Sequence, residues 1–507
     1  MRRFWVLALF FSLLLTVALF MPSCSEEKTT EMETVYREAP PIVGAARKSA
    51  YLRPEGSAPF PVTAPLVVLR GTWRGMGEEY GKRAAAEIRQ VFEGLYQSLV
   101  ETGIDLRTLS EDIAVCHASL GKLSPDMLEF MEGIAEGSSL ETEKSAYGDD
   151  LDAVQKIVLI NFFSSLYEKA PGSEGGLEEE GSAWECRGTL TDGELALAGV
   201  NVDASFYPFM YRLALVVIPD DPESNIYFTL PSAGSIGGTV GYNEEGLFIA
   251  ALPVGTPASQ SALEGEPGVN VGNEPSFTLP SSLLSILALM DSDDVDTARE
   301  TLLHGPHEIG AENEGEELIP CAGTDFLIAD RETALVLERD PSHYGLREEE
   351  SNENDGAFIA STDHFAASES YGANGEASGQ PMTAYGLSGE DIAGSAVRMR
   401  SLEGLFRKGD VKIDAPWLMA NAAGMNYIFD EQGQKSYQVN DALGQVVSCF
   451  ESGLTVDRYI TRANSPYFGT VCSVVVNTVT MDVWYELGLP SDWVGPWEHI
   501  SMSDYSR

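Results

Sequence analysis

The spacing of apolar side chains predicts that the first part of the folded chain is helical. Over residues 76–95 they recur every three or four positions, as in a helix with one buried face. A second helix is predicted over 124–137, where Ser124 can act as the N-cap, Pro125 suits the first turn and Gly137 suits the end. A third helix is predicted over 151–167. With a short strand at 65–70, residues 62–181 are expected to be mainly helical.

Beyond residue 181 the pattern changes to short apolar runs separated by turn residues. The expected strands are 183–188, 195–202, 212–218, 226–230, 247–252, 325–330, 334–340, 471–478 and 482–487. Helices are expected at 282–290, 294–303 and 395–407, and the Gly-, Ser- and Ala-rich segment 352–389 is expected to be a loop. Separate runs of strands and helices favour an α+β architecture, in which helices cover layered sheets.

The N-terminus has the pattern of an export signal. Two arginines precede an apolar run over 4–21, and Met-Pro-Ser-Cys follows it. This ending resembles a bacterial lipobox, in which Cys24 becomes the lipidated first residue, and 25–61 then reads as a polar tether. Plain secretion and a retained membrane anchor are the alternatives. All three place the folded body outside the cytoplasm, and the first makes a lipid anchor its contact with the membrane.

Composition and charge narrow the classes of partner. The chain is 44% hydrophobic and 22% charged, as in a globular protein, but its formal net charge is -46. Such a charge repels polyanions, so nucleic-acid partners are excluded. The six histidines lack metal-ligand spacing and no C-x-x-C is present, so neither a metal nor a cofactor is expected. One or two disulfides are possible among the widely spread cysteines.

Residues 182–203 suggest a hairpin that carries a nucleophile. A turn centred between Asp192 and Gly193 would place Ser182 opposite Asp203, and Cys186 opposite Gly199. Ser182 would then begin a strand directly after the exposed acidic loop "GSEGGLEEEG". Cleavage before it would expose an N-terminal serine whose own amine can act as its base. The alternative is an ordinary hairpin with a solvent-exposed serine.

Several separated stretches resemble one enzyme family in the same order. They are "LRGTWRGMGEEYGKRAAAEIR", "LSPDMLEFMEGIAEGSSLE", "GTLTDGELALAGVNVD", "GSIGGTVGYNEEGLFIA", "CAGTDFLIADRETALVLE" and "STDHF", and they span residues 69–484. The chain thereby resembles the acyl-CoA:6-aminopenicillanic-acid acyltransferase (C45) type of N-terminal nucleophile hydrolase. This resemblance implies a four-layer αββα sandwich and a precursor that is cut before its nucleophile. Residues 62–181 would form the smaller segment, and 182–507 the core.

The resemblance also implies chemistry and site residues. The nucleophile would attack the carbonyl of a small acylated amide or peptide-like substrate, and water or an amine would resolve the acyl-enzyme. Asn243 matches the asparagine of the oxyanion hole, and Asp203 the aspartate that orients the amine or nucleophile. Asn201 belongs to the same motif as Asp203. Arg398 and His364 match positions on the substrate side, although Arg398 taken alone reads as a solvated helix charge.

Three positions depart from the family pattern. Gly181 occupies the usual nucleophile position, Val200 replaces an arginine, and Asp363 replaces an asparagine. Three interpretations stay open: Ser182 is a displaced nucleophile, Cys186 attacks from within the strand, or the scaffold binds an acylated ligand or a partner without turnover. Hydrolysis of lipid acyl groups, as in phospholipase B-like relatives of the fold, is a further alternative.

Overall fold

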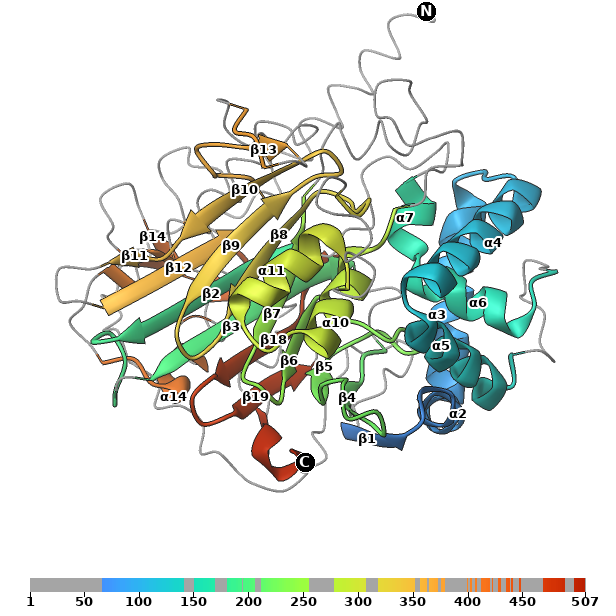
Figure 1. Ribbon diagram of the computed structural model, residues 1–507, viewed down its shortest axis with the longest axis horizontal. Helices are drawn as coiled ribbons and strands as arrows, with labels where there is room; N and C mark the ends of the chain where they lie inside the picture. Colours follow the sequence, from blue (N-terminus) through green and yellow to red (C-terminus); the bar gives the residue numbers. More distant parts are fainter. Residues whose placement is uncertain are drawn as a thin grey trace, which may run out of the picture. The chain divides into compact units, whose positions relative to one another are not determined.

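Two antiparallel-rich sheets organise the folded body. In the computed structural model (Figure 1) the larger has nine strands in the order β1-β4-β5-β6-β7-β8-β9-β10-β13, and only the β1–β4 pair is parallel. Its strands are β1 (Leu66–Gly71), β4 (Ala214–Pro219), β5 (Tyr227–Thr229), β6 (Val240–Asn243), β7 (Phe248–Pro253), β8 (Thr324–Ala329), β9 (Ala334–Arg339), β10 (His343–Glu348) and β13 (Tyr371–Gly372).

The second sheet has seven antiparallel strands in the order β11-β12-β2-β3-β18-β19-β20. These are β11 (Glu350–Ser351), β12 (Gly356–Thr362), β2 (Glu180–Gly188), β3 (Ala196–Ser205), β18 (Phe468–Asn477), β19 (Asp482–Leu487) and β20 (Glu498–Ser501). Two short pairs join β14 (Tyr427–Phe429) to β15 (Lys435–Tyr437) and β16 (Val439–Asn440) to β17 (Val446–Val447).

The part of the chain that the structure describes lies within the unit Glu38–Arg507. It comprises residues 66–140, 150–168, 180–193, 195–205, 211–254, 278–306, 318–351, 356–362, 364–372, 375–378, 399, 402–403, 406–407, 412–419, 422, 427–429, 435–437, 439–440, 446–447, 468–487 and 497–506. The predicted leader 1–24, with Cys24, and the tether 25–61 lie outside the described residues.

Helices form further layers. They are α2 (Trp73–Arg83), α3 (Ala85–Glu101), α4 (Leu106–Leu123), α5 (Pro125–Ser138), α6 (Ala153–Asn161), α7 (Phe163–Glu168), α10 (Ser281–Asp291), α11 (Val295–His304), α14 (Ala415–Leu418) and the 3-10 turn η4 (Met502–Asp504). The helices α2–α7, α10 and α11 share one apolar core with alternate residues of the nine-stranded sheet, such as Leu215 and Ile249. On the seven-stranded sheet, Trp184 and Phe358 pack against Phe406 and Leu418.

The two sheets pack face to face, and we call the facing sides their inner faces. Val200 and Val474 of the seven-stranded sheet share a core with Phe228, Ala250 and Leu327 of the nine-stranded sheet. The opposite sides, the outer faces, carry the helical layers. Because successive residues of a strand point to opposite faces, each strand serves both cores. The α+β class and the αββα order of layers are therefore confirmed.

Helices α2 and α5 approach each other through glycines. A Cβ atom at Gly77 would lie 2.2 Å from the Phe130 carbonyl oxygen, and one at Gly137 would lie 2.1 Å from that of Glu78. Neither position has room for a side chain, so the two helix backbones are in direct contact. On the exposed side, Arg74 Nη1 pairs with Glu132 Oε2 at 2.8 Å. The close distance between α2 and α5 thus depends on glycines, which have no side chain, and not on the packing of large side chains.

The pairing predicted for β2 and β3 is wrong by two residues. Ser182 lies opposite Asn201, not Asp203, and Cys186 lies opposite Leu197, not Gly199. The connection is longer than a tight turn, because its middle is bound elsewhere: the Asp192 N–H donates to the carbonyl of Ile413 at 2.8 Å. The strand also begins at Glu180, so Ser182 is its third residue and not its first.

One segment that we expected to be a loop contains a strand. β12 lies within 352–389 and pairs with β2 along its whole length, from Gly356 opposite Gly188 to Thr362 opposite Ser182. Its apolar residues Phe358 and Ile359 face opposite cores. The Gly-, Ser- and Ala-rich composition concealed this strand, because small residues are compatible with burial between two sheets.

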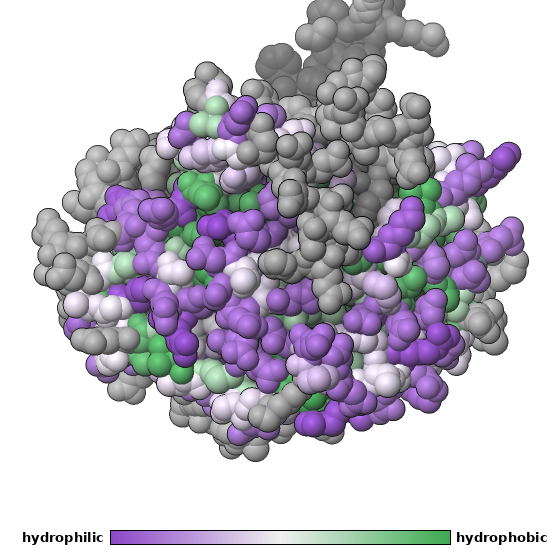
Figure 2. Space-filling model, in the orientation of Figure 1, coloured by the Kyte–Doolittle hydropathy of each residue, from purple (hydrophilic) through white to green (hydrophobic). Residues whose placement is uncertain are grey.

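The visible surface is mostly hydrophilic, as the net charge of -46 leads one to expect (Figure 2). In the described part of the chain, the large apolar side chains that are well exposed are Leu106 and Val479, at 43% and 49%. None of the described helices is both long and apolar enough to cross a bilayer. Likewise, the described residues contain no group of three or more His, Cys, Asp or Glu side chains arranged to hold a metal ion.

Candidate functional site

A row of polar side chains crosses the seven-stranded sheet at the start of β2. Thr362 of β12, Ser182 of β2, Asn201 of β3 and Ser473 of β18 lie directly opposite one another in turn. Residues opposite each other point to the same face, and in this row it is the outer face that also carries Trp184. Ser182, Asn201 and Thr362 are fully buried at 0% exposure. We call these four residues the polar row.

Hydrogen bonds link the polar row to its cover. Ser473 Oγ donates to Asn201 Oδ1 at 2.8 Å, and Asn201 Nδ2 donates to the carbonyl of Ala422 at 3.0 Å. At the other end, Thr362 Oγ1 and His364 Nδ1 are 3.2 Å apart. The row therefore brings together three predicted site residues: Ser182, Asn201 and, through Thr362, the buried His364.

Gly181, at the family's nucleophile position, faces the other way. It lies opposite Val202, which belongs to the core between the sheets. A Cβ atom there would lie 2.2 Å from the Asn201 carbonyl oxygen and 3.1 Å from a methyl carbon of Leu252. This position thus has no room for a cysteine unless β3 moves. Because Ser182 points to the outer face, it does not simply replace a nucleophile at position 181.

Asn243 is placed far from this row and has a structural role. Its Nδ2 donates to the carbonyls of Leu289 and Ser292 at 3.0 and 2.8 Å, and its Oδ1 accepts the N–H groups of Glu245 and Leu247. Both amide protons and both acceptor positions are used, so nothing remains for an oxyanion. Asn243 also lies at the opposite end of β7 from Leu252, roughly 15 Å along the strand. The structure does not bring it to Ser182.

The remaining predicted residues divide into a buried thiol and residues without a described side chain. Cys186 is fully buried in the outer-face apolar cluster, and this burial raises the pKa of its thiol, which disfavours the reactive thiolate. The backbone of Asp203 lies opposite that of Glu180, outside the pair predicted for it. The side chain of Asp203 and all of Arg398, Asp363 and Cys24 lie outside the described residues.

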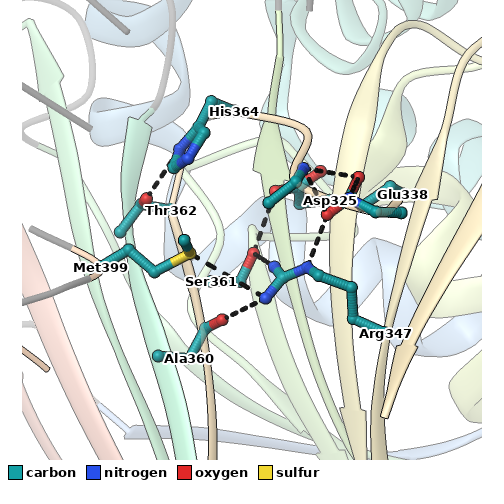
Figure 3. Close-up of polar contacts among 10 residues, drawn as sticks. Asp325, Glu338, Arg347, Ala360, Ser361, Thr362, His364 and Met399 are labelled. Atoms are coloured by element: carbon teal, nitrogen blue, oxygen red, sulfur yellow. Dashed lines mark hydrogen bonds and ion pairs between the residues drawn. The ribbon is translucent and has the colours of Figure 1, made fainter. Parts of the chain in front are cut away.

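A second polar group, which the sequence did not predict, lies between the sheets (Figure 3). Asp325, Glu338 and Arg347 come from three neighbouring strands of the nine-stranded sheet, and Ser361 comes from β12. Ser361 Oγ donates to Asp325 Oδ2 at 3.0 Å, and Arg347 Nε pairs with Glu338 Oε1 at 2.6 Å. The signal in the sequence that could have revealed this group is the presence of charged residues in otherwise apolar strands: Asp325 in "TDFLIA", and Glu338 and Arg339 in "ALVLER".

Another buried ionic group lies between the sheets. Arg187 Nε is 2.9 Å from Glu185 Oε1 and 3.0 Å from Glu349 Oε1. One cation thus serves two carboxylates. Burial raises the pKa of both, and well above the ordinary value for Glu185, although the charge of Arg187 acts in the opposite direction. This group favours the retention of a proton between the sheets.

Comparisons with known proteins give only distant likenesses. No protein-family model matches the chain, and no curated protein matches it in sequence. A mutant conjugated bile acid hydrolase from Clostridium perfringens is 12% identical, with 64% of this chain and 93% of that chain covered and a TM-score of 0.32. An N-acylethanolamine-hydrolyzing acid amidase ortholog from Caenorhabditis elegans is 10% identical, with 59% and 92% covered and a TM-score of 0.32.

A penicillin V acylase from Agrobacterium tumefaciens is 12% identical, with 60% of this chain and 82% of that chain covered and a TM-score of 0.28. The three names are those of a hydrolase, an amidase and an acylase. At scores and identities this low, the likenesses carry no argument about this chain. Its fold class rests on its own sheets and helical layers.

Proposed function

We propose that the chain is an acyl-amide hydrolase or acyltransferase whose chemistry takes place at the polar row, with Ser182 as the nucleophile. The supporting observation is that Ser182 lies directly between Thr362 and Asn201, with His364 bound to Thr362. The Ser182 hydroxyl and the Asn201 carboxamide are thus register neighbours on one face of the sheet, and the His364 imidazole is joined to the row through Thr362. The ordered motifs that resemble the C45 type support acyl transfer as the kind of reaction.

The proposed chemistry begins with hydrolysis of the Gly181–Ser182 peptide bond, in which water adds across the C–N bond and leaves a carboxylate on Gly181 and an α-amine on Ser182. The new α-amine, with an ordinary pKa near ~8, then accepts the proton of Ser182 Oγ. The oxygen attacks the substrate carbonyl, the carbon–oxygen ester bond forms, and the leaving amine departs with the proton. Water or an acceptor amine then attacks the ester and releases the acyl group, which regenerates the hydroxyl.

Cleavage would also give access to Ser182. In the intact chain its side chain is fully buried, and the two preceding residues are paired with Asp203 and Val202 of β3. Because a cut after Gly181 leaves only two residues of the upstream fragment in the sheet, that end can leave β3. We therefore expect the intact chain to be inactive.

Intact-mass analysis of the mature protein tests this function. The wild type is expected as two fragments that divide between Gly181 and Ser182, and Ser182→Ala as one chain. Ser285→Ala is the matched control, because Ser285 is also fully buried but lies inside α10. The cleaved wild type should release the acyl group from acylated amides. A single uncut chain in all three samples would remove Ser182 as the nucleophile.

A second candidate, binding of an acylated ligand without turnover, is favoured by Gly181. The position that faces the inter-sheet layer has neither a nucleophilic side chain nor room for one. If this is the function, the uncut wild type and Ser182→Ala should bind acylated amides with equal affinity by calorimetry. Hydrolysis by the wild type alone would rule it out.

A further inference from the structure

The turn that carries His364 is hydrogen-bonded on both sides to one ion pair of the nine-stranded sheet, Glu338 and Arg347. Before the turn, Arg347 Nη1 donates to the Ala360 carbonyl at 2.9 Å and Nη2 donates to Ser361 Oγ at 3.3 Å. After it, Glu338 accepts the N–H groups of Ala366 and Ala367 at 2.8 Å. Figure 3 shows Arg347 joined by dashed lines to Glu338 and to Ala360 and Ser361 of β12. Both ends of the segment 360–367 are thus fixed to β9 and β10.

Stability alone is a poor explanation for this ion pair. The side chain of Glu338 is 0% exposed and that of Arg347 is 17% exposed, so both charges are largely removed from water. The loss of hydration at such sites often cancels the attraction, and apolar replacements are often no less stable. The pair does fix the position of the backbone that it binds, because charge-assisted hydrogen bonds are short and require a specific geometry.

The turn joins Thr362 to His364 by two short contacts. The His364 N–H donates to the Thr362 carbonyl at 2.6 Å, while the two side chains are in hydrogen-bond distance. Thr362 is the register partner of Ser182. Any shift of the segment 360–367 would therefore move the imidazole and the threonine hydroxyl relative to Ser182.

We propose that Glu338 and Arg347 are positioning residues that hold Thr362 and His364 in place beside Ser182. This inference rests on the proposed function for the role of Thr362 and His364 in catalysis. The hydrogen bonding of Glu338 and Arg347 to the segment 360–367 can be measured without that function. The two residues touch the backbone on either side of the turn and act through it. They form a link by which the nine-stranded sheet sets the geometry of the polar row in the other sheet.

The test compares Glu338→Ala and the conservative Glu338→Gln with a matched control. The control is Glu185→Gln. Glu185 is likewise fully buried between the sheets in an ion pair, but its partner is Arg187 and not Arg347. In Glu338→Ala, hydrogen exchange within 360–367 should accelerate by roughly tenfold or more, since bonds to a charged acceptor are lost. Glu338→Gln should restore part of the protection, and Glu185→Gln should leave this segment unchanged.

Two further readouts separate positioning from folding. The NMR signals of the His364 ring should change position in Glu338→Ala but not in the control. In a cleaved, active enzyme kcat should fall more than KM changes. If exchange within 360–367 is unaltered, or rises equally throughout the chain, the positioning role is wrong. If the wild type is inactive but hydrogen exchange within 360–367 still accelerates in Glu338→Ala, the proposed function is refuted, while the positioning of this segment by Glu338 is supported.

Discussion

At the residue scale, neighbours along a strand have opposite surroundings. Gly181 and Ser182 are adjacent, yet one faces the core between the sheets and the other faces the outer layer. The same alternation places Glu185 between the sheets and Cys186 in an apolar cluster. A shift of one position along β2 therefore changes the chemistry available to a side chain completely.

The buried Glu185 predicts a dependence of stability on pH. Burial raises its pKa well above the ordinary 4.5, so the folded chain holds a proton that the unfolded chain releases between these two values. The free energy of unfolding therefore falls as pH rises through that window. Glu185→Gln, which cannot ionise, should remove this part of the decrease and be more stable than the wild type on the alkaline side.

Urea unfolding of both proteins at a series of pH values measures this difference. Glu332→Gln is the control, because the side chain of Glu332 is 79% exposed. Its difference from the wild type should stay close to zero at every pH. A Glu185→Gln curve parallel to the wild type would show that Glu185 stays ionised when buried.

At the scale of elements, contacts between backbones set the geometry of the helical layer. The motifs "GMGEEYG" and "MEGIAEG" place Gly77, Gly81, Gly133 and Gly137 where α2 meets α5. A helix interior normally disfavours glycine by about 1 kcal/mol relative to alanine. Four glycines at one contact are thus explained by the close approach and not by helix formation.

Substitution of one of these glycines should separate the helices. In Gly137→Ala the new methyl group would meet the Glu78 carbonyl, which belongs to a backbone and cannot turn aside. We expect the free energy of unfolding to fall by about 1–3 kcal/mol, as in other overpacked cores. Gly121→Ala in α4 is the control, because there the nearest atom is a rotatable methyl of Leu128. Thermal unfolding that is equal in both variants would contradict this view of the α2–α5 contact.

At the scale of the whole molecule, the sheets join segments that are far apart in the chain. The bond from Ser473 to Asn201 spans 272 residues, and Asp192 is held by Ile413. The candidate site is therefore a product of the complete sandwich. The leader and the tether, outside the described residues, would decide where this sandwich is located.

Lipid anchoring at Cys24 gives a prediction about location. The lipobox-like ending of the apolar run predicts that the exported chain is acylated on this cysteine and held at the membrane surface. Cys24→Ser should abolish incorporation of labelled fatty acid and release the body from the membrane fraction. Cys116→Ser, a change in a buried cysteine of α4, should leave labelling intact. Labelling that persists in Cys24→Ser would show that the lipid is attached elsewhere.

The sequence by itself determined the fold class and those elements that have a strong local signal, whereas α4, β10 and β12 were not predicted. Local signals suffice for a helix such as α5, where Ser124 caps the Met127 N–H and Pro125 stands in the first turn. They also suffice for strands such as β7, β8 and β9, each of which contains at least four consecutive apolar residues. The order of the layers was implied by the resemblance of the ordered motifs to the C45 type.

Only the tertiary structure decided which side chains meet. The register of β2 and β3 depends on a loop bound to Ile413, and the strand β12 becomes evident only from its pairing with β2. The polar row combines residues from four strands of one sheet, and the hydrogen bonds of Glu338 and Arg347 connect the other sheet to the segment 360–367. Such pairings are set by long-range hydrogen bonds and shared burial, for which no periodic signal exists along the chain. For that reason the sequence predicted the scaffold, while the partners of Ser182 had to be read from its folded form.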